Sequence, residues 1–167
     1  MKRLIVIFSL IGILTACIND DNTGADVKVG DSLPSFEVVM NDGSVMTDAE
    51  LRGNISLLMF FHPSCPDCQQ ALPIVQTIYD EYTTKGVVFS LISRECGNDE
   101  VSVFWEKNGL KMPYSAQTDR SIYELFASSL IPRIYISDEN GSVRYIFTDD
   151  PVPSYEVLKS SLESLIR

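Results

Sequence analysis

Short apolar runs alternate along the chain with segments in which apolar side chains recur every three or four residues. Residues 55–61 are almost all apolar, which is typical of a strand buried on both faces of a sheet. Residues 66–82 instead have helical spacing, and Lys85-Gly86 then ends the helix. Residues 87–92 form a second apolar run, which we expect to lie parallel to the first as its neighbour.

The rest of the chain continues this alternation. Its expected elements are, in order, a strand at 36–40, a turn at 41–44, a helix at 99–108 closed by Gly109, a short helix at 121–127, strands at 133–137 and 143–147 around the turn Asp138-Glu139-Asn140-Gly141, and a helix at 154–166. An order of β-α-β-α, then an antiparallel hairpin and a closing helix, predicts an α/β fold with a mixed central sheet flanked by helices.

The first sixteen residues have the features of an export signal. Lys2 and Arg3 precede an apolar run at residues 4–14, which is too short for a transmembrane span. Leu14-Thr15-Ala16-Cys17 resembles the lipobox of bacterial lipoproteins, which implies cleavage before Cys17 and lipidation of its thiol. Several acyl chains would hold a soluble domain on a membrane. The alternative is a plain signal peptide with an incidental Cys17.

We therefore divide the chain into a lipoprotein signal peptide at 1–16, a lipidated tether at 17–27 and one domain at 28–167. The tether is polar and lacks periodicity. Its acidic residues just after Cys17 resemble the surface-export signals of some Gram-negative lipoproteins. We expect the protein at the cell envelope, on the periplasmic face or at the outer membrane or cell surface of a Gram-negative bacterium.

The charge of the chain limits its partners. It has 13 Lys and Arg against 23 Asp and Glu, a net charge of −10, and removal of residues 1–16 would take away two charged residues, Lys2 and Arg3, both basic. Phosphate binding requires clustered Lys and Arg, so the composition excludes nucleic acid as a partner.

Cysteine usage points to redox chemistry. Of four cysteines, Cys17 is assigned to the lipid, and three are too few for a disulfide-stapled scaffold. Cys65-Pro66-Asp67-Cys68 falls where a buried strand meets a helix, and Pro66 suits the first helical turn. The free amides and dipole of that helix would stabilise a thiolate at Cys65, while Cys68, one turn on, would be more buried. We expect Cys65 to attack a disulfide and Cys68 to resolve the mixed disulfide.

Several ordered motifs carry a resemblance to a known family. They are Val29-Gly30-Asp31-Ser32-Leu33-Pro34-Ser35-Phe36, Asp42-Gly43, Leu51-Arg52-Gly53 and Phe60-Phe61-His62-Pro63-Ser64-Cys65-Pro66-Asp67-Cys68. Together they resemble the TlpA/ResA branch of thioredoxin-like thiol-disulfide oxidoreductases, which borders the AhpC/TSA peroxiredoxins. The resemblance runs from about residue 28 to the C-terminus. It implies a thioredoxin-like fold with an added N-terminal β-hairpin.

The resemblance also assigns Ile131-Pro132, because the family places a cis-proline before its third core strand, facing the cysteines. Proline tolerates the cis bond far better than other residues do. Ile131 would then offer backbone hydrogen bonds to an extended substrate. Two positions depart from the family: Ser64 replaces a frequent Trp, and Ala71 replaces a Glu that handles protons.

Three residues are expected at the same edge of the sheet as the cysteine pair. Glu95, just after the second buried strand, is the nearest replacement for the missing acid, although a solvated surface glutamate is the simpler interpretation. Cys96 is a third thiol within reach of the pair or a buried free cysteine. His62 is the only histidine, and it assists the thiolate, forms part of a substrate groove or packs the loop.

Asp67 carries an electrostatic prediction. A carboxylate between the two cysteines should oppose the thiolate form of Cys65 and stabilise the disulfide, which would make the protein a reductant. The alternative is an exposed aspartate with little effect on the pair.

Three other functions remain open. Residues 61–65 also resemble the loop before a peroxiredoxin's reactive cysteine, but the Pro and the Thr or Ser expected seven and three residues earlier are Leu58 and His62. Copper or zinc could bind Cys65, Cys68 and His62, with Cys96 as a further ligand, although copper chaperones of this fold use wider cysteine spacing and a distant histidine. The third is a thioredoxin fold that only binds a partner and whose Cys65–Cys68 disulfide is structural.

We expect no cofactor other than the redox-active Cys65–Cys68 disulfide and no bound metal. The expected partners are the thiols and disulfides of exported proteins and a membrane electron donor, and we expect a monomer. Shallow grooves rather than deep pockets would recognise the substrate.

Overall fold

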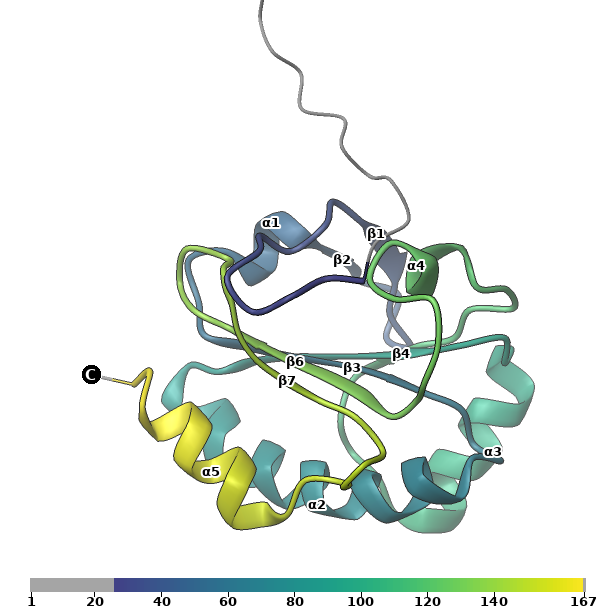
Figure 1. The fold of residues 1–167 in the computed structure, drawn as a ribbon. Coiled ribbons are helices and arrows are strands. Elements are labelled where there is room, and N and C mark those ends of the chain that lie inside the picture. Colours follow the sequence, from purple (N-terminus) through teal and green to yellow (C-terminus); the bar gives the residue numbers. More distant parts are fainter. Residues whose placement is uncertain (1–25, 167) are drawn as a thin grey trace, which may run out of the picture.

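The computed structural model describes residues 26–166, so the predicted signal peptide, the lipidation site at Cys17 and most of the tether lie outside the described residues. A five-stranded sheet forms its centre, with the strand order β5-β4-β3-β6-β7 (Figure 1). The strands are β3 (Ser56–Phe61), β4 (Val88–Ser93), β5 (Tyr114–Ser115), β6 (Arg133–Ser137) and β7 (Val143–Phe147). β3 lies parallel to β4 and antiparallel to β6, so the predicted mixed central sheet is confirmed.

Helices and a hairpin cover the two faces of the sheet (Figure 1). The long helix α2 (Pro66–Tyr82), α3 (Asn98–Asn108) and the closing helix α5 (Tyr155–Glu163) lie on one face. The hairpin of β1 (Glu37–Val39) and β2 (Val45–Thr47), with α1 (Asp48–Leu51) and α4 (Ser121–Glu124), lies on the other. A 3-10 turn, η1 (Thr83–Lys85), follows α2.

The apolar run of β3 is explained by this layering. Every residue of β3 is buried, because successive side chains alternate between two covered faces. Phe60 packs against Tyr123 and Phe126, with ring centroids 5.3 and 5.0 Å apart, whereas Phe61 packs against Trp105 of α3 at 4.9 Å.

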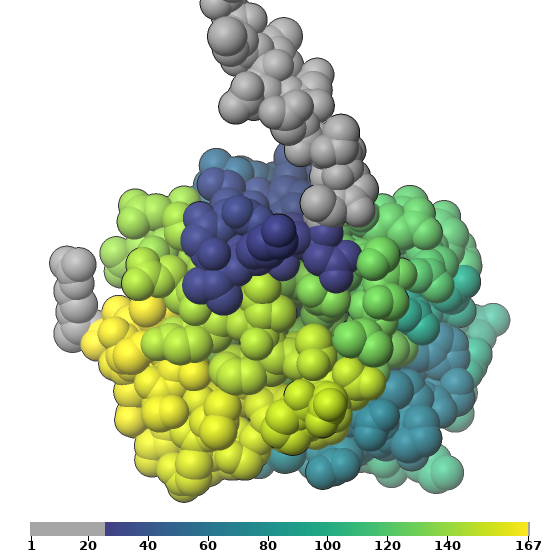
Figure 2. All heavy atoms as spheres, in the orientation of Figure 1, coloured from purple at the N-terminus to yellow at the C-terminus, as the bar shows by residue number. Residues whose placement is uncertain are grey.

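The N-terminal hairpin is part of the same body as the sheet. Figure 2 shows this segment, in purple, packed against later parts of the chain in green and yellow. The backbone N–H of Gly30 donates to the carbonyl of Val143 at 2.8 Å, and that of Leu33 donates to the carbonyl of Gly141 at 2.9 Å. These bonds attach the segment before the hairpin to β7 and the turn that precedes it. The hairpin implied by the family resemblance is present and is joined to β5, because the N–H of Asn41 donates to the Tyr114 carbonyl and the Ser115 hydroxyl donates to the Val39 carbonyl, both at 2.7 Å.

Most predicted elements occur within two residues of their expected bounds, and α2, β6 and β7 match fully. The helix expected at 121–127 was wrong at its end, since α4 stops at Glu124. The carbonyl of Phe126 accepts the N–H of Val27 at 2.9 Å, which draws this segment toward the N-terminal chain. The closing helix is likewise shorter than 154–166: Ser154 is its N-cap, and Ser164 is its C-cap. Three elements of residues 26–166 were missed, β5, α1 and η1, and β2 was expected only as part of the hairpin that the resemblance implies. Among residues 26–166, no helix is both long and apolar enough to cross a bilayer.

Candidate functional site

The candidate site lies at the edge of the sheet where the parallel strands β3 and β4 end. Phe61 and Ser93 are register partners at these two carboxyl ends, so the loops that follow them are neighbours. The first loop leads into α2 and carries the cysteine pair, and the second leads into α3 and carries Cys96. Ligand and catalytic sites of α/β sheets commonly form at such an edge.

Cys65 is the N-cap residue of α2, as predicted. Its Sγ accepts the backbone N–H of Cys68 at 3.3 Å, and the thiol lies 3.5 Å from the carbonyl oxygen of Ile131. Pro66 occupies the first helical position, where no backbone N–H is required. The sulfur thus receives a backbone N–H from the first helical turn, and the half-buried position leaves Cys65 accessible to a partner.

Cys68 is fully buried, in contrast to its half-buried partner. Burial raises the pKa of the Cys68 thiol well above its usual range, and the hydrogen bond between this thiol and Cys65 raises it further. The backbone of His62 and the positive charge of Arg94 act in the opposite direction on the same pKa. The pair is therefore asymmetric, with one half-buried cysteine and one buried thiol that stays protonated in the reduced fold.

The loop before β6 faces Cys65. The Ile131–Pro132 peptide bond is cis, as the family resemblance implied, and the Asp150–Pro151 bond, which was not predicted, is cis as well. Leu130 has a φ of 72° and a side chain that is 49% exposed. The Tyr123 hydroxyl donates to the Leu130 carbonyl at 2.8 Å, which helps to hold this conformation beside the site.

A surface hollow of about 410 Å³ surrounds Cys65. Its lining residues come from the loops after β3 and β4, the start of α2 and the loop before β6: His62, Ser64, Cys65, Pro66, Arg94, Glu95 and Ile131. Arg94 was not among the predicted site residues. Its position directly after β4 in the sequence was the available signal, because the carboxyl end of that strand lies beside the cysteine pair.

Glu95 lines this hollow, as expected for a replacement acid, but its carboxylate pairs with arginines. Its Oε2 lies 3.4 Å from Arg120 and 3.7 Å from Arg94. The backbone of Glu95 has a φ of 60°, a conformation that few non-glycine residues adopt. Ala71, at the position of the family glutamate, is buried on α2. Asp67 lies half-buried in the first turn of α2, between the two cysteines.

His62 and Cys96 come together in a second cluster, which also contains Glu100 of α3. Ligand atoms of the three side chains all lie within 4.8 Å of one another. Burial raises the pKa of the Cys96 thiol to about 12, and its hydrogen bond to the Glu100 carboxylate adds to the shift. Glu100 was not predicted. Its signal was its spacing, because Glu100 follows Cys96 by four residues where a helix begins.

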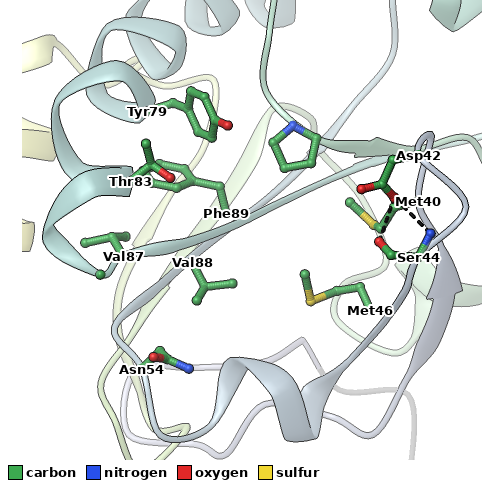
Figure 3. Close-up of a pocket in the computed structure, with 12 residues that line it drawn as sticks. Met40, Asp42, Ser44, Met46, Asn54, Tyr79, Thr83, Val87, Val88 and Phe89 are labelled. Carbon is green, nitrogen blue, oxygen red and sulfur yellow. Dashed lines mark hydrogen bonds between the residues drawn. The ribbon is translucent and has the colours of Figure 1, made fainter.

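Another hollow, of about 460 Å³, lies near the amino end of β4 (Figure 3). Met40, Met46, Tyr79 and Phe89 form much of its apolar wall. Asp42 lies at its rim, where its carboxylate accepts the N–H and the hydroxyl of Ser44. These bonds lower the pKa of Asp42. Its lining contains neither cysteine nor histidine, so the reactive groups lie at the other hollow.

Comparison of the sequence with known proteins finds relatives that carry the same name. The thiol-disulfide oxidoreductase ResA of Geobacillus kaustophilus is 26% identical over 164 residues, which cover 97% of this chain and 91% of the relative. ResA of Oceanobacillus iheyensis is 25% identical over 147 residues, covering 86% of this chain and 76% of the relative.

Solved structures show the same fold. The thioredoxin domain of a thiol-disulfide oxidoreductase from Bacteroides vulgatus superposes with a TM-score of 0.74 at 16% identity, covering 85% of this chain and all of that one. A thiol:disulfide interchange protein of the thioredoxin family from Chlorobium tepidum gives 0.72 at 21% identity, with 86% and 100% covered. The fold is therefore thioredoxin-like. The family model described as Redoxin matches residues 28–166, and the chain belongs to the Redoxin family.

Proposed function

We propose that this protein is a thiol-disulfide oxidoreductase that reduces disulfides of exported proteins through Cys65 and Cys68. The observation that carries the proposal is the asymmetry of the pair, in which an accessible sulfur caps a helix and a buried thiol lies one turn behind it. Relatives named thiol-disulfide oxidoreductase ResA support the same chemistry.

The reaction begins with the Cys65 thiolate. It attacks one sulfur of a partner disulfide, forms a mixed disulfide, and releases the partner's other sulfur as a thiolate. Cys68 then loses its proton and attacks Cys65 Sγ, which forms the Cys65–Cys68 disulfide and releases the second partner sulfur. Two electrons have passed to the partner, so a membrane electron donor must reduce the pair again for a further turnover.

The cis-proline loop would hold the partner during this exchange. An extended segment of substrate can pair with the backbone of Ile131, next to Pro132, because the Ile131 carbonyl already lies 3.5 Å from the Cys65 thiol. The exposed Leu130 side chain adds an apolar contact beside that backbone. A shallow hollow with one exposed sulfur suits a flexible protein segment.

Three groups would assist the exchange. The positive charge of Arg94 lowers the pKa of Cys68 and so favours the thiolate that attacks in the resolving step. Glu95, which lines the hollow around Cys65, would accept the proton of Cys68 after separating from its arginine partners. Asp67 would oppose the Cys65 thiolate and so favour the disulfide, which suits a reductant.

Lipidation of Cys17 would tether this domain at the cell envelope through residues 17–27. The apolar run, the lipobox and the acidic tether support that location. The anchor would keep the pair within reach of a membrane electron donor.

The test is to trap the partner. A Cys68→Ser variant, expressed in its own envelope, should accumulate mixed disulfides on Cys65, because no resolving thiol remains. The samples are quenched with acid and alkylated, and their mixed disulfides are compared with and without reductant, which should release them. The captured proteins are identified by mass spectrometry.

Two controls make the trap decisive. Cys65→Ser/Cys68→Ser should capture nothing, whereas Cys68→Ser/Cys96→Ser should capture the same partners. An empty trap together with an unreactive Cys65 would refute the proposal. Peroxide consumption with a thiol donor should not exceed that of the Cys65→Ser variant, and a clear excess would indicate a peroxidase instead.

A further inference from the structure

Three side chains with different ligand chemistry converge beside the redox pair. His62 follows β3, Cys96 follows β4, and Glu100 lies in the first turn of α3. Their ligand atoms lie within 4.8 Å of one another. Imidazole, thiolate and carboxylate are the three ligand types that zinc binds in proteins. We propose that His62, Cys96 and Glu100 form a zinc site, separate from the Cys65–Cys68 pair.

The geometry and charge of this cluster suit a divalent ion. Tetrahedral zinc with ordinary bond lengths separates its ligand atoms by roughly 3.3–3.7 Å, so the ligand atoms of His62 and Glu100 need to move by about 1.5 Å at most. Glu100 is exposed and His62 is half-buried, so both side chains can make that adjustment. One thiolate and one carboxylate neutralise the two charges of zinc. Three protein ligands leave a fourth position open to water.

The surrounding structure already orients two of the ligands. The backbone N–H of Ser64 donates to Nδ1 of His62 at 3.1 Å, and Ser64 Oγ lies 2.8 Å from the same nitrogen, so Nε2 is the nitrogen left for a metal. Zinc binding at Nε2 would move the ring proton to Nδ1, where Ser64 Oγ would accept it. The backbone of Cys96 is fixed on both sides: its N–H donates to Gln117 at 2.8 Å, and its carbonyl accepts the Ser93 hydroxyl at 2.6 Å.

The test must separate this site from the cysteine pair, because a dithiol also binds zinc. In the chain carrying Cys17→Ser, Cys65→Ser and Cys68→Ser, Cys96 is the single cysteine left of four. We expect one zinc per chain by elemental analysis after dialysis. Cobalt(II), used as a spectroscopic probe, should give a thiolate-to-metal charge-transfer band, and zinc should displace it.

Glu100→Gln in that background should weaken zinc binding by about 10-fold or more, whereas Asp99→Asn, the neighbouring acid on the same helical turn, should leave it unchanged. Because Glu100 is exposed, its replacement should not unfold the chain, which circular dichroism would check. No cobalt–thiolate band, less than one zinc per chain, or equal affinity in Glu100→Gln would each overturn the proposal. The trapping result does not depend on this outcome, since these residues are not the exchanging thiols.

Discussion

The two strand-to-helix junctions at this edge of the sheet have the same local structure, but their cysteines have different environments. β3 and β4 are parallel neighbours, each ends in a loop with a cysteine, and each loop opens a helix. Cys65 is the N-cap of α2, and its sulfur accepts a helix amide. Cys96 stands one residue before the N-cap of α3, Gly97, and its sulfur lies 3.9 Å from the Gly97 carbonyl.

The two cysteines differ by one position relative to the N-cap of the following helix, and this difference gives the two sulfurs different surroundings. The N-cap position directs Cys65 at free N–H groups, which stabilise negative charge. The preceding position buries Cys96 and places its thiol against the Glu100 carboxylate, which favours the protonated form. In this fold we therefore expect Cys65, whose sulfur accepts a helix amide, to be more reactive than Cys96.

The largest effect expected from this comparison is on exchange activity. Cys65→Ser should lower the rate of disulfide reduction by roughly 10³-fold or more, because the nucleophile is lost. Cys96→Ser should leave the rate near that of the unmodified chain. Reduction of a protein disulfide followed by thiol release measures both. A comparable loss in Cys96→Ser would show that the second junction takes part in the reaction.

Alkylation of the reduced chain should separate the two cysteines by rate. Cys96 is 2% exposed and Cys68 is fully buried, so iodoacetamide reaches them only after a local opening that costs a few kcal/mol. We expect Cys65 to react at least about 100-fold faster than either. Peptide mass spectrometry over time gives the three rates. In denaturant the rates should converge, and convergence without denaturant would contradict the burial.

The stability of the reduced chain should depend on alkaline pH. The folded state holds Cys96 protonated up to about pH 12, whereas the unfolded thiol begins to ionise near its ordinary value. A raised pKa in the fold gives stability that is complete below the unfolded value and is lost as pH rises toward 12. The loss is about 1.4 kcal/mol per pH unit for each such thiol.

Urea unfolding under reductant at pH 8, 9 and 10 measures this dependence. Cys96→Ala should remove one thiol's share of the slope, and Cys68→Ala should remove another, because burial also raises the Cys68 pKa. Cys65→Ala is the comparison variant, because it removes the hydrogen bond that adds to the Cys68 shift and leaves the burial, which is the larger cause. Equal slopes in Cys96→Ala and the parent chain would show that Cys96 ionises freely in the fold.

The sequence predicted the elements that are specified by residues close together in the chain better than the elements that depend on distant residues. Residues 66–82 were predicted with correct bounds, because Pro66 marks the start and apolar spacing continues through Tyr82. The short helix α1 was missed although its signal is local: Thr47 and Glu50 form a capping box. Strand β5 has only two residues and pairs with β4 alone, so no periodicity could predict it.

The candidate site also has one part that neighbouring sequence predicts and one part that it does not. The position of Cys65 follows from strand and helix patterns that lie next to it in the chain. The contact of His62 with Cys96 and Glu100 joins segments more than thirty residues apart, and it depends on side-chain directions that spacing does not specify. The metal set considered from the sequence combined His62 with the Cys65–Cys68 pair, whereas the described cluster contains neither cysteine of that pair.

The smallest expected effect comes from making the two junctions more alike. α2 has a side-chain cap, but Gly97 gives α3 none. Gly97→Ser should add a hydroxyl acceptor for a first-turn amide and stabilise the chain by a few tenths of a kcal/mol. Its φ of −77° suits serine, and a Cβ there would lie 3.4 Å from the Thr118 methyl, so the space suffices. Gly97→Ala supplies the Cβ without the oxygen and is the matched control in urea unfolding. If both variants shift stability equally, the missing cap is not what distinguishes α3 from α2.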